Sequence, residues 1–120
     1  MTPVASSKFK VKDVSSTRWS TTPSGFSSGS RVYQRVSGNV TIIDFALTPT
    51  QAKTADLNSY HDVCELGYSC LDSNGPAVTG FRASDVAVQF RISSNKLQAY
   101  WPQGWATDNS MRGQIVAFIE

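Results

Sequence analysis

The chain holds one histidine and two cysteines, the residue types that could form a metal site or a nucleophilic centre. They occur in the spacing H-x2-C-x5-C, as His61, Cys64 and Cys70, with Asp62 beside the histidine. Tetrahedral zinc needs four ligands, and this spacing is not a usual zinc pattern. A cysteine nucleophile would need the histidine against it and a third group to orient the imidazole. We therefore expect structural thiols here, with no metal and no catalytic residue.

A disulfide between the two cysteines would close a short loop and is the alternative to free thiols. The N-terminus has no apolar signal core, so we expect synthesis in a cytoplasm, a compartment that favours free thiols.

The sequence contains no GxSxG, no glycine-rich phosphate loop before a helix, and no carboxylates paired for glycoside hydrolysis. These observations favour a protein that is not an enzyme and has no cofactor. An enzyme that acts on cell walls is the weakest of three candidate functions.

A second group of residues suits the binding of sugars. Aromatic rings cover the C–H faces of a sugar, planar polar side chains hydrogen-bond its hydroxyls, and an arginine can hold a carboxylate or a phosphate. Residues of these types gather toward one end of a predicted hairpin, and the predicted saccharide-binding residues are Gln89, Arg91, Tyr100, Trp101, Trp105 and Arg112. The alternative is that both tryptophans belong to the core or to a subunit interface, where such residues are common.

A β-hairpin over residues 86–101 is the element that would position most of these side chains. Val88, Phe90 and Ile92 alternate with polar residues, and this period of two is typical of a strand with one buried face. Residues 93–96 supply the turn, in which Asn95 is expected to adopt a positive φ. The alternation then resumes and predicts that Tyr100 and Trp101 face opposite sides of the sheet.

The remaining sequence favours a single all-β domain over residues 15–120, preceded by an N-terminal arm or linker over residues 1–14. The chain has 120 residues, of which 17% are charged, and strong helix formers are sparse. Further strands are expected around Trp19, at 31–46 as a hairpin turning at Gly38-Asn39, at 63–71, at 77–81 and at 113–119. A turn is expected at 72–76, and residues 48–57 predict a single helical turn.

The last predicted strand, residues 113–119, is apolar on both faces. Ile115 and Ala117 lie on one side, and Val116 and Phe118 lie on the other. A small barrel has one interior, so the second face is expected to be buried against another element or subunit.

Charge and hydropathy exclude two classes of partner. The net charge is only +2 and the basic residues are dispersed, which argues against nucleic acid. No apolar run approaches the roughly 20 residues of a membrane span, so we expect a soluble chain with no membrane partner.

From Trp19 to the C-terminus, the order of these features resembles the C-terminal head domains of receptor-binding proteins from tailed phages. The nearest likeness is to siphophages that infect lactococci and related Gram-positive bacteria. It rests on the segments RVYQRVSGNVTI, C-x5-C, FRISSNKLQAYW and GQIVAFIE. These are patterns of strand and turn and not a catalytic signature.

The resemblance implies a small antiparallel β-barrel or sandwich that forms a homotrimer at the virion's tail tip or baseplate, docked to other baseplate proteins. The terminal strand would then lie near the subunit contacts. Such heads bind host cell-wall saccharides, commonly phosphorylated, in clefts near subunit boundaries. Tyr100 and Arg112 stand where the family has its cleft aromatic and arginine. Gln89 and Arg91 replace the family's histidine and aspartate, which implies a more anionic ligand.

Two functions from different classes follow. The leading one is a phage head that attaches to host cell-wall saccharide without catalysis. The second is a structural virion or tail protein whose aromatic residues form subunit contacts and which binds no ligand of its own.

Overall fold

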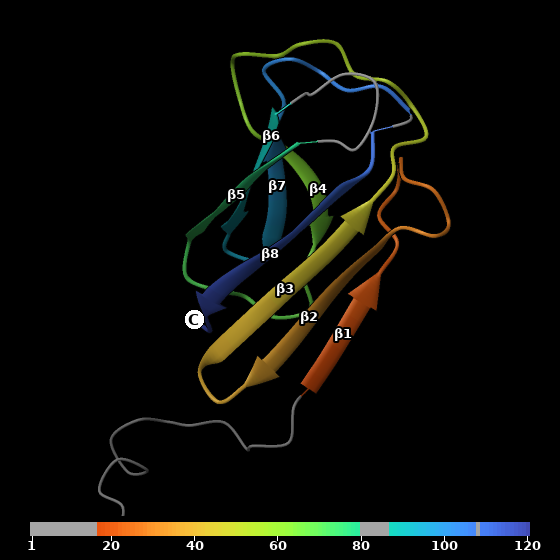
Figure 1. Cartoon of the computed structure of the whole chain (residues 1–120). Coiled ribbons are helices and arrows are strands. Elements are labelled where there is room, and N and C mark those ends of the chain that lie inside the picture. Colours follow the sequence, from red (N-terminus) through yellow and green to blue (C-terminus); the bar gives the residue numbers. More distant parts are fainter. Residues whose placement is uncertain (1–16, 80–86, 108) are drawn as a thin grey trace, which may run out of the picture.

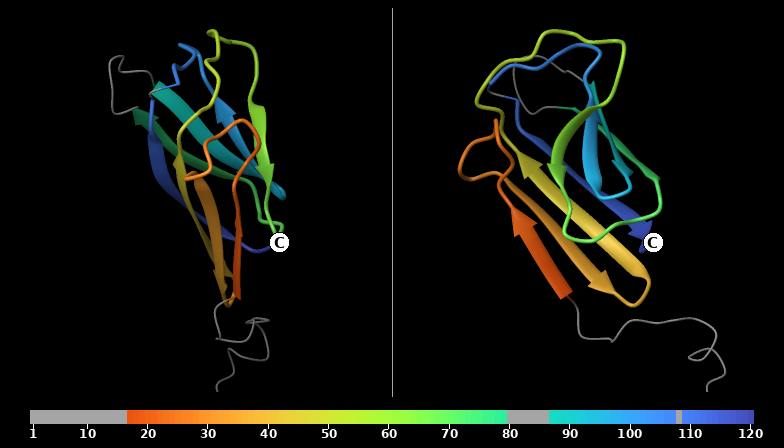
Figure 2. Two further views of the ribbon diagram at one scale, coloured as in Figure 1. Left: turned by 90° about the vertical axis from the view of Figure 1, so that its right-hand side faces the viewer. Right: turned by 180° about the vertical axis from the view of Figure 1, so that it is seen from behind.

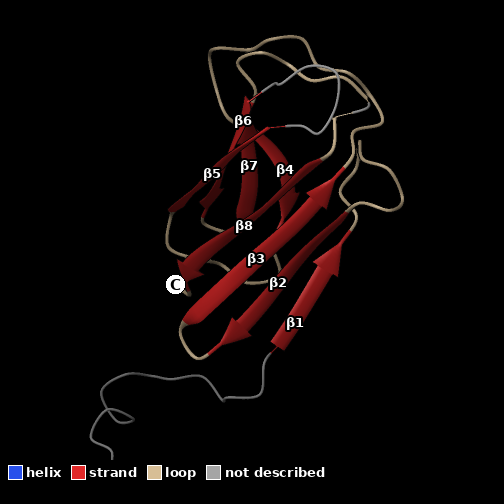
Figure 3. Ribbon diagram, in the orientation of Figure 1, coloured by secondary structure: helices blue, strands red, loops and turns tan. Residues whose placement is uncertain are grey.

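The computed structural model describes residues 17–79, 87–107 and 109–120 (Figure 1). Its strands are β1 (Thr17–Thr21), β2 (Arg31–Ser37), β3 (Val40–Leu47), β4 (His61–Glu65), β5 (Ser73–Thr79), β6 (Ala87–Ser93), β7 (Lys96–Tyr100) and β8 (Met111–Phe118). Figure 3 shows only strands and loops in these ranges, so the all-β prediction is confirmed. No helix there is long and apolar enough to cross a membrane. The predicted N-terminal arm lies outside the described residues.

The strands form two antiparallel sheets, each of four strands. The first sheet has the order β1-β2-β3-β8 and the second has the order β4-β7-β6-β5. The two sheets lie one behind the other (Figure 2), and the segment that leads into β5 approaches β8, where the Leu71 N–H donates to the Phe118 carbonyl at 2.8 Å. The two ladders nevertheless remain separate sheets. Of the expected barrel or sandwich, the described chain thus forms two antiparallel sheets that do not close into a barrel.

The core lies between the two sheets and follows the period of two. Val88, Phe90 and Ile92 on β6 are at most 1% exposed, as the alternation predicted. The rings of Phe45 on β3 and Phe90 on β6 pack with centroids 4.3 Å apart, which joins the sheets directly. Burial of such aliphatic and aromatic surface is the main source of the domain's stability.

Both predicted hairpins form, with one change in turn geometry. The β2–β3 turn uses Gly38 with φ 63°, in the expected place. In the β6–β7 turn the positive φ belongs to Ser94, at 57°, and not to Asn95 as predicted. A positive φ at the first central residue only is the sign pattern of a type II′ turn, whereas Asn95 was expected from the residue's general tolerance of that region.

Three local predictions are wrong. The strand expected at 63–71 is the shorter β4, which ends at Glu65. The residues expected to turn at 72–76 are mostly strand, because β5 runs through Gly75 and Pro76 with a register shift between Asn74 and Ala77. β5 is an edge strand, where a bulge accommodates a proline that cannot donate a ladder hydrogen bond. Residues 48–57 form no helical turn, because their backbone groups pair with distant segments. The Lys53 N–H, for example, donates to the Trp105 carbonyl at 3.0 Å.

The terminal strand is β8, which begins two residues before its predicted start. Ile115 and Ala117 face the core, while Val116 and Phe118 are 55% and 59% exposed on the outer face of the first sheet. Leu71 and Val40 are exposed as well, and Val40 is the cross-strand partner of Phe118. Burial of this outer apolar face against a second subunit stays a prediction.

Candidate functional site

The β6–β7 hairpin brings three of the six predicted saccharide-binding residues together. Across the hairpin, Gln89 pairs with Tyr100 and Arg91 pairs with Gln98. The inward residues of both strands are buried, so these four side chains share the outer face of the second sheet. Tyr100 is half-buried on this face while Trp101 is buried, which confirms that the two rings face opposite sides.

Strand β4 extends this outer face through a chain of hydrogen bonds. Arg91 Nε donates to Gln98 Oε1 at 2.8 Å. Gln98 Nε2 in turn donates to Asp62 Oδ1 at 2.8 Å. Lys96 Nζ lies 3.6 Å from the other oxygen of Asp62. The chain fixes the rotamer of each planar group before any ligand arrives, which lowers the entropic cost of binding.

Tyr60, just before β4, completes the surface with a second aromatic ring. The Arg91 guanidinium carbon lies 3.8 Å from the centroid of the Tyr60 ring, a cation–π arrangement. The Tyr60 and Tyr100 rings pack with centroids 5.4 Å apart. Among the described residues neither Nη nitrogen of Arg91 has a hydrogen-bond partner. The guanidinium is thus held in place with two nitrogens left to donate. We name this surface the tyrosine–arginine face; it comprises Tyr60, Asp62, Gln89, Arg91, Gln98 and Tyr100.

The two tryptophans lie elsewhere, at the end of the domain above the second sheet. Trp101 and Trp105 are 8% and 6% exposed and pack edge to face, with centroids 4.4 Å apart. The His61 ring stacks on Trp101 at 4.1 Å. Both indoles line a cavity of about 340 Å³, but their faces are largely covered by protein. Their low exposure favours the core alternative in the single chain, and their part in saccharide binding stays a prediction.

Arg112 is also separated from the hairpin. It sits on β8 opposite Ala46 of β3, exposed on the outer face of the first sheet. The outer faces of two stacked sheets point in opposite directions, so Arg112 and Tyr100 do not form one site within a chain. The sequence placed them together because Arg112 follows the hairpin that carries Tyr100, while the sheet that β8 joins depends on long-range pairing.

Residues 50–60, which we name the strap, cross the end of the domain and lead into β4. Asp56 anchors it twice, through its N–H to the Trp101 carbonyl at 3.1 Å and through Oδ2 to His61 Nε2 at 2.7 Å. The Asn58 backbone N–H and the His61 ring lower the pKa of Asp56. The Tyr100 hydroxyl donates to the Leu57 carbonyl at 3.3 Å. These contacts set the position of Tyr60 at the end of the strap.

Cys64 and Cys70 are free thiols in the structure. Cys70 is buried and accepts a hydrogen bond from Gln34 Nε2 at 3.4 Å. Burial raises the pKa of Cys64 to about 12 and also raises that of Cys70. A raised pKa makes a thiol a poor nucleophile at neutral pH. The described residues contain no group of three metal-ligating side chains.

The Cys64 thiol predicts a loss of stability in alkali. Its folded pKa of about 12 exceeds the ordinary 9.0, so its contribution is present below pH 9 and is lost as the pH rises toward 12. When the pH rises from 8 to 10, the equilibrium constant for folding should decrease about tenfold more in the wild type than in Cys64→Ala. Urea unfolding at the two pH values measures this difference. Equal losses in both proteins would contradict the assignment.

Sequence reasoning missed three members of the tyrosine–arginine face. Gln98 could have been found from the sequence, because it lies two residues from Tyr100 and so on the same face of the strand. It also lies opposite Arg91 if the hairpin has a two-residue turn. Tyr60 and Asp62 carried no such signal, since their place beside β7 follows from the long-range pairing of β4. A search of protein-family models finds no match to this chain, and a search of curated proteins finds none either.

Proposed function

We propose that the chain is a non-enzymatic saccharide-binding domain, the receptor-binding head of a tailed phage, which attaches to host cell-wall saccharide. The observation that carries this proposal is the tyrosine–arginine face. It offers two aromatic rings, a guanidinium with two donor nitrogens, and amide and carboxylate groups fixed by mutual hydrogen bonds. Half-buried rings beside planar polar groups on a rigid sheet suit a sugar's C–H face and its hydroxyls together.

The proposed assembly is a homotrimer at the virion's tail tip or baseplate, held by other tail proteins. The exposed apolar residues of β8, Val116 and Phe118, supply a surface that association would bury. The same residues favour the second candidate, a structural virion protein, since subunit contacts alone would also use them. Saccharide binding by the isolated protein separates the two candidates.

We expect the protein to bind immobilised lactococcal cell-wall polysaccharide saturably, and to lose about tenfold or more in affinity in Arg91→Ala and in Tyr100→Ala. Arg91→Ala loses a charged hydrogen bond, which costs about 1.5–3 kcal/mol, and each 1.4 kcal/mol is tenfold. Tyr100→Ala loses the ring on which the sugar's C–H face packs. Tyr100→Phe keeps the ring and should bind nearly as the wild type does. Surface plasmon resonance measures the affinities, and light scattering reports the oligomeric state.

Three outcomes would change this proposal. A wild-type protein that binds no wall polysaccharide from a panel of Gram-positive hosts would favour the structural protein. Release of reducing sugar from the polysaccharide would indicate an enzyme. A loss of binding in Arg112→Ala as large as that in Tyr100→Ala would place the site across a subunit boundary, since the two residues are apart within one chain.

A further inference from the structure

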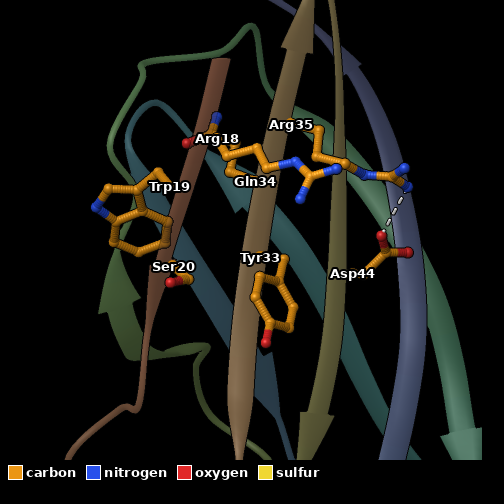
Figure 4. Close-up of a pocket in the computed structure, with 7 residues that line it drawn as sticks. All are labelled: Arg18, Trp19, Ser20, Tyr33, Gln34, Arg35 and Asp44. Atoms are coloured by element: carbon orange, nitrogen blue, oxygen red, sulfur yellow. Dashed lines mark hydrogen bonds and ion pairs between the residues drawn. The ribbon is translucent and has the colours of Figure 1, made fainter. Parts of the chain in front are cut away.

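The outer face of the first sheet carries a hollow of about 330 Å³, on the opposite side of the domain from the tyrosine–arginine face. Its lining residues are Arg18, Trp19, Ser20, Tyr33, Gln34, Arg35 and Asp44 (Figure 4). The strand alternation turns Gln34 to the interior, where it is buried, and its cross-strand partner Trp19 shares that face. We name the remaining five the arginine hollow.

Strand register explains why these five side chains meet. Arg18 on β1 is directly opposite Arg35 on β2, and Ser20 is opposite Tyr33. Tyr33 is opposite Asp44 on β3. Tyr33 is 47% exposed, yet its chain neighbours Val32 and Gln34 are fully buried. An exposed ring on a firmly anchored strand is a preorganised stacking surface.

The hollow carries more positive than negative charge. Arg35 Nη2 pairs with Asp44 Oδ2 at 2.9 Å. Gln114 Nε2 donates to the other oxygen of Asp44 at 2.7 Å. Arg18 has no ion pair among the described residues, and Figure 4 shows its side chain extending from β1 over β2 toward Arg35. Two guanidinium groups against one carboxylate leave the hollow cationic.

The other charged residues named on this outer face are also positive. Arg31 precedes Tyr33 by two residues and is exposed, as is Arg112 on β8. On the tyrosine–arginine face and its edge, by contrast, the two cations Arg91 and Lys96 are equalled in number by Asp62 and Glu65, both of which pair with Lys96. The domain therefore presents one cationic outer face and one that is close to neutral.

We propose that the arginine hollow is a second binding site, specific for a saccharide that carries a carboxylate or a phosphate. The sugar's C–H face packs on the Tyr33 ring, and the anionic group lies against the guanidinium groups of Arg18 and Arg35. Hydroxyl groups donate to Asp44, whose carboxylate has lone pairs beyond the two in use. This site is independent of the one proposed above and would make the head bivalent for a charged wall polymer.

The central carboxylate favours a saccharide over a nucleic acid. Asp44 would repel a phosphodiester backbone that followed the sheet, and single-strand binding usually relies on successive stacked bases on several rings. Tyr33 is the single aromatic side chain among the five residues of the hollow. A sugar ring needs one such platform and benefits from an acceptor beside it.

The test is a titration of the full chain, followed by NMR, with four probes. They are tri-galacturonate, glucose 6-phosphate, the neutral galactotriose and a dT15 oligonucleotide. We expect one acidic sugar to bind at least tenfold more tightly than galactotriose and to shift the amide signals of Ser20, Tyr33 and Asp44. Whichever acidic sugar binds more tightly identifies the anionic group.

Variants assign the binding to the hollow. Tyr33→Ala and Arg18→Gln should each weaken acidic-sugar binding at the Ser20, Tyr33 and Asp44 signals about tenfold, and Tyr33→Phe should preserve it. The matched control Lys53→Gln, an exposed cation outside both faces, should leave it unchanged. No acidic-sugar binding at millimolar concentration would overturn the proposal. So would binding lost in Arg91→Gln but kept in Arg18→Gln, a result that would still support the tyrosine–arginine face. Tighter binding of dT15 that is insensitive to Tyr33→Ala would show a general polyanion surface instead.

Discussion

Replacing Gly104 with alanine should lower the free energy of unfolding by about 3 kcal/mol, because two costs combine. Gly104 has φ +70°, a conformation that disfavours any residue with a Cβ. A Cβ at this position would also overlap the backbone carbonyl oxygen of Lys53 on the strap. The strap must then move, which breaks the paired hydrogen bonds between Lys53 and Trp105, each 3.0 Å long. Thermal and urea unfolding measure the loss.

Gly25→Ala is the matched control for this substitution. Gly25 has φ +87°, but nothing lies within 4 Å of the Cβ that alanine would add. It therefore reports the cost of the positive φ alone, about 1–2 kcal/mol. Equal losses in Gly25→Ala and Gly104→Ala would show that the strap tolerates the Cβ. A larger loss in Gly104→Ala, with weaker saccharide binding, would connect the strap to the position of Tyr60.

The parts of this fold that the sequence predicts are those with local signals. Alternation over Val88, Phe90 and Ile92, followed by small polar turn residues, specifies a hairpin and its buried face. A two-residue turn then dictates the cross-strand register. For that reason the sequence alone is enough to place Gln89, Arg91 and Tyr100 on one surface.

The parts that the sequence does not predict depend on which strands become neighbours. β8 pairs with β3 and not with β7, and this choice carries Arg112 to the opposite side of the domain. The strap covers Trp101 and Trp105 through backbone contacts made by residues with no periodic pattern. The arginine hollow has the same origin, because Arg18, Tyr33 and Asp44 come from three strands and no spacing in the chain relates them.

Gln34 is the residue whose loss should most weaken the connection between the first sheet and the loop that joins β4 to β5. Its side chain is fully buried, its Nε2 donates to the Tyr68 carbonyl at 3.0 Å, and its Oε1 accepts from the Tyr68 N–H at 3.0 Å. Gln34→Leu removes both bonds while keeping a similar volume. We expect a loss of about 2 kcal/mol, since both part-buried backbone groups of Tyr68 lose the Gln34 amide while the carbonyl keeps the Cys70 thiol as a donor at 3.4 Å. Gln114→Leu, an exposed amide on the same sheet, should cost no more than about 0.5 kcal/mol.

Gln34→Glu adds a test of the direction of these bonds. A glutamate can still accept from the Tyr68 N–H, but it can donate to the Tyr68 carbonyl only when protonated. Burial disfavours the ionised form and raises the pKa of this glutamate above that of the unfolded chain. The variant's stability is then fully present below the unfolded pKa and is lost as the pH rises through the folded one. The difference in the free energy of unfolding between the wild type and Gln34→Glu should therefore be smaller at pH 4 than at pH 7. A pH-independent difference in urea unfolding would mean that the side chain has turned away from the loop, and that the amide does not hold the two segments together.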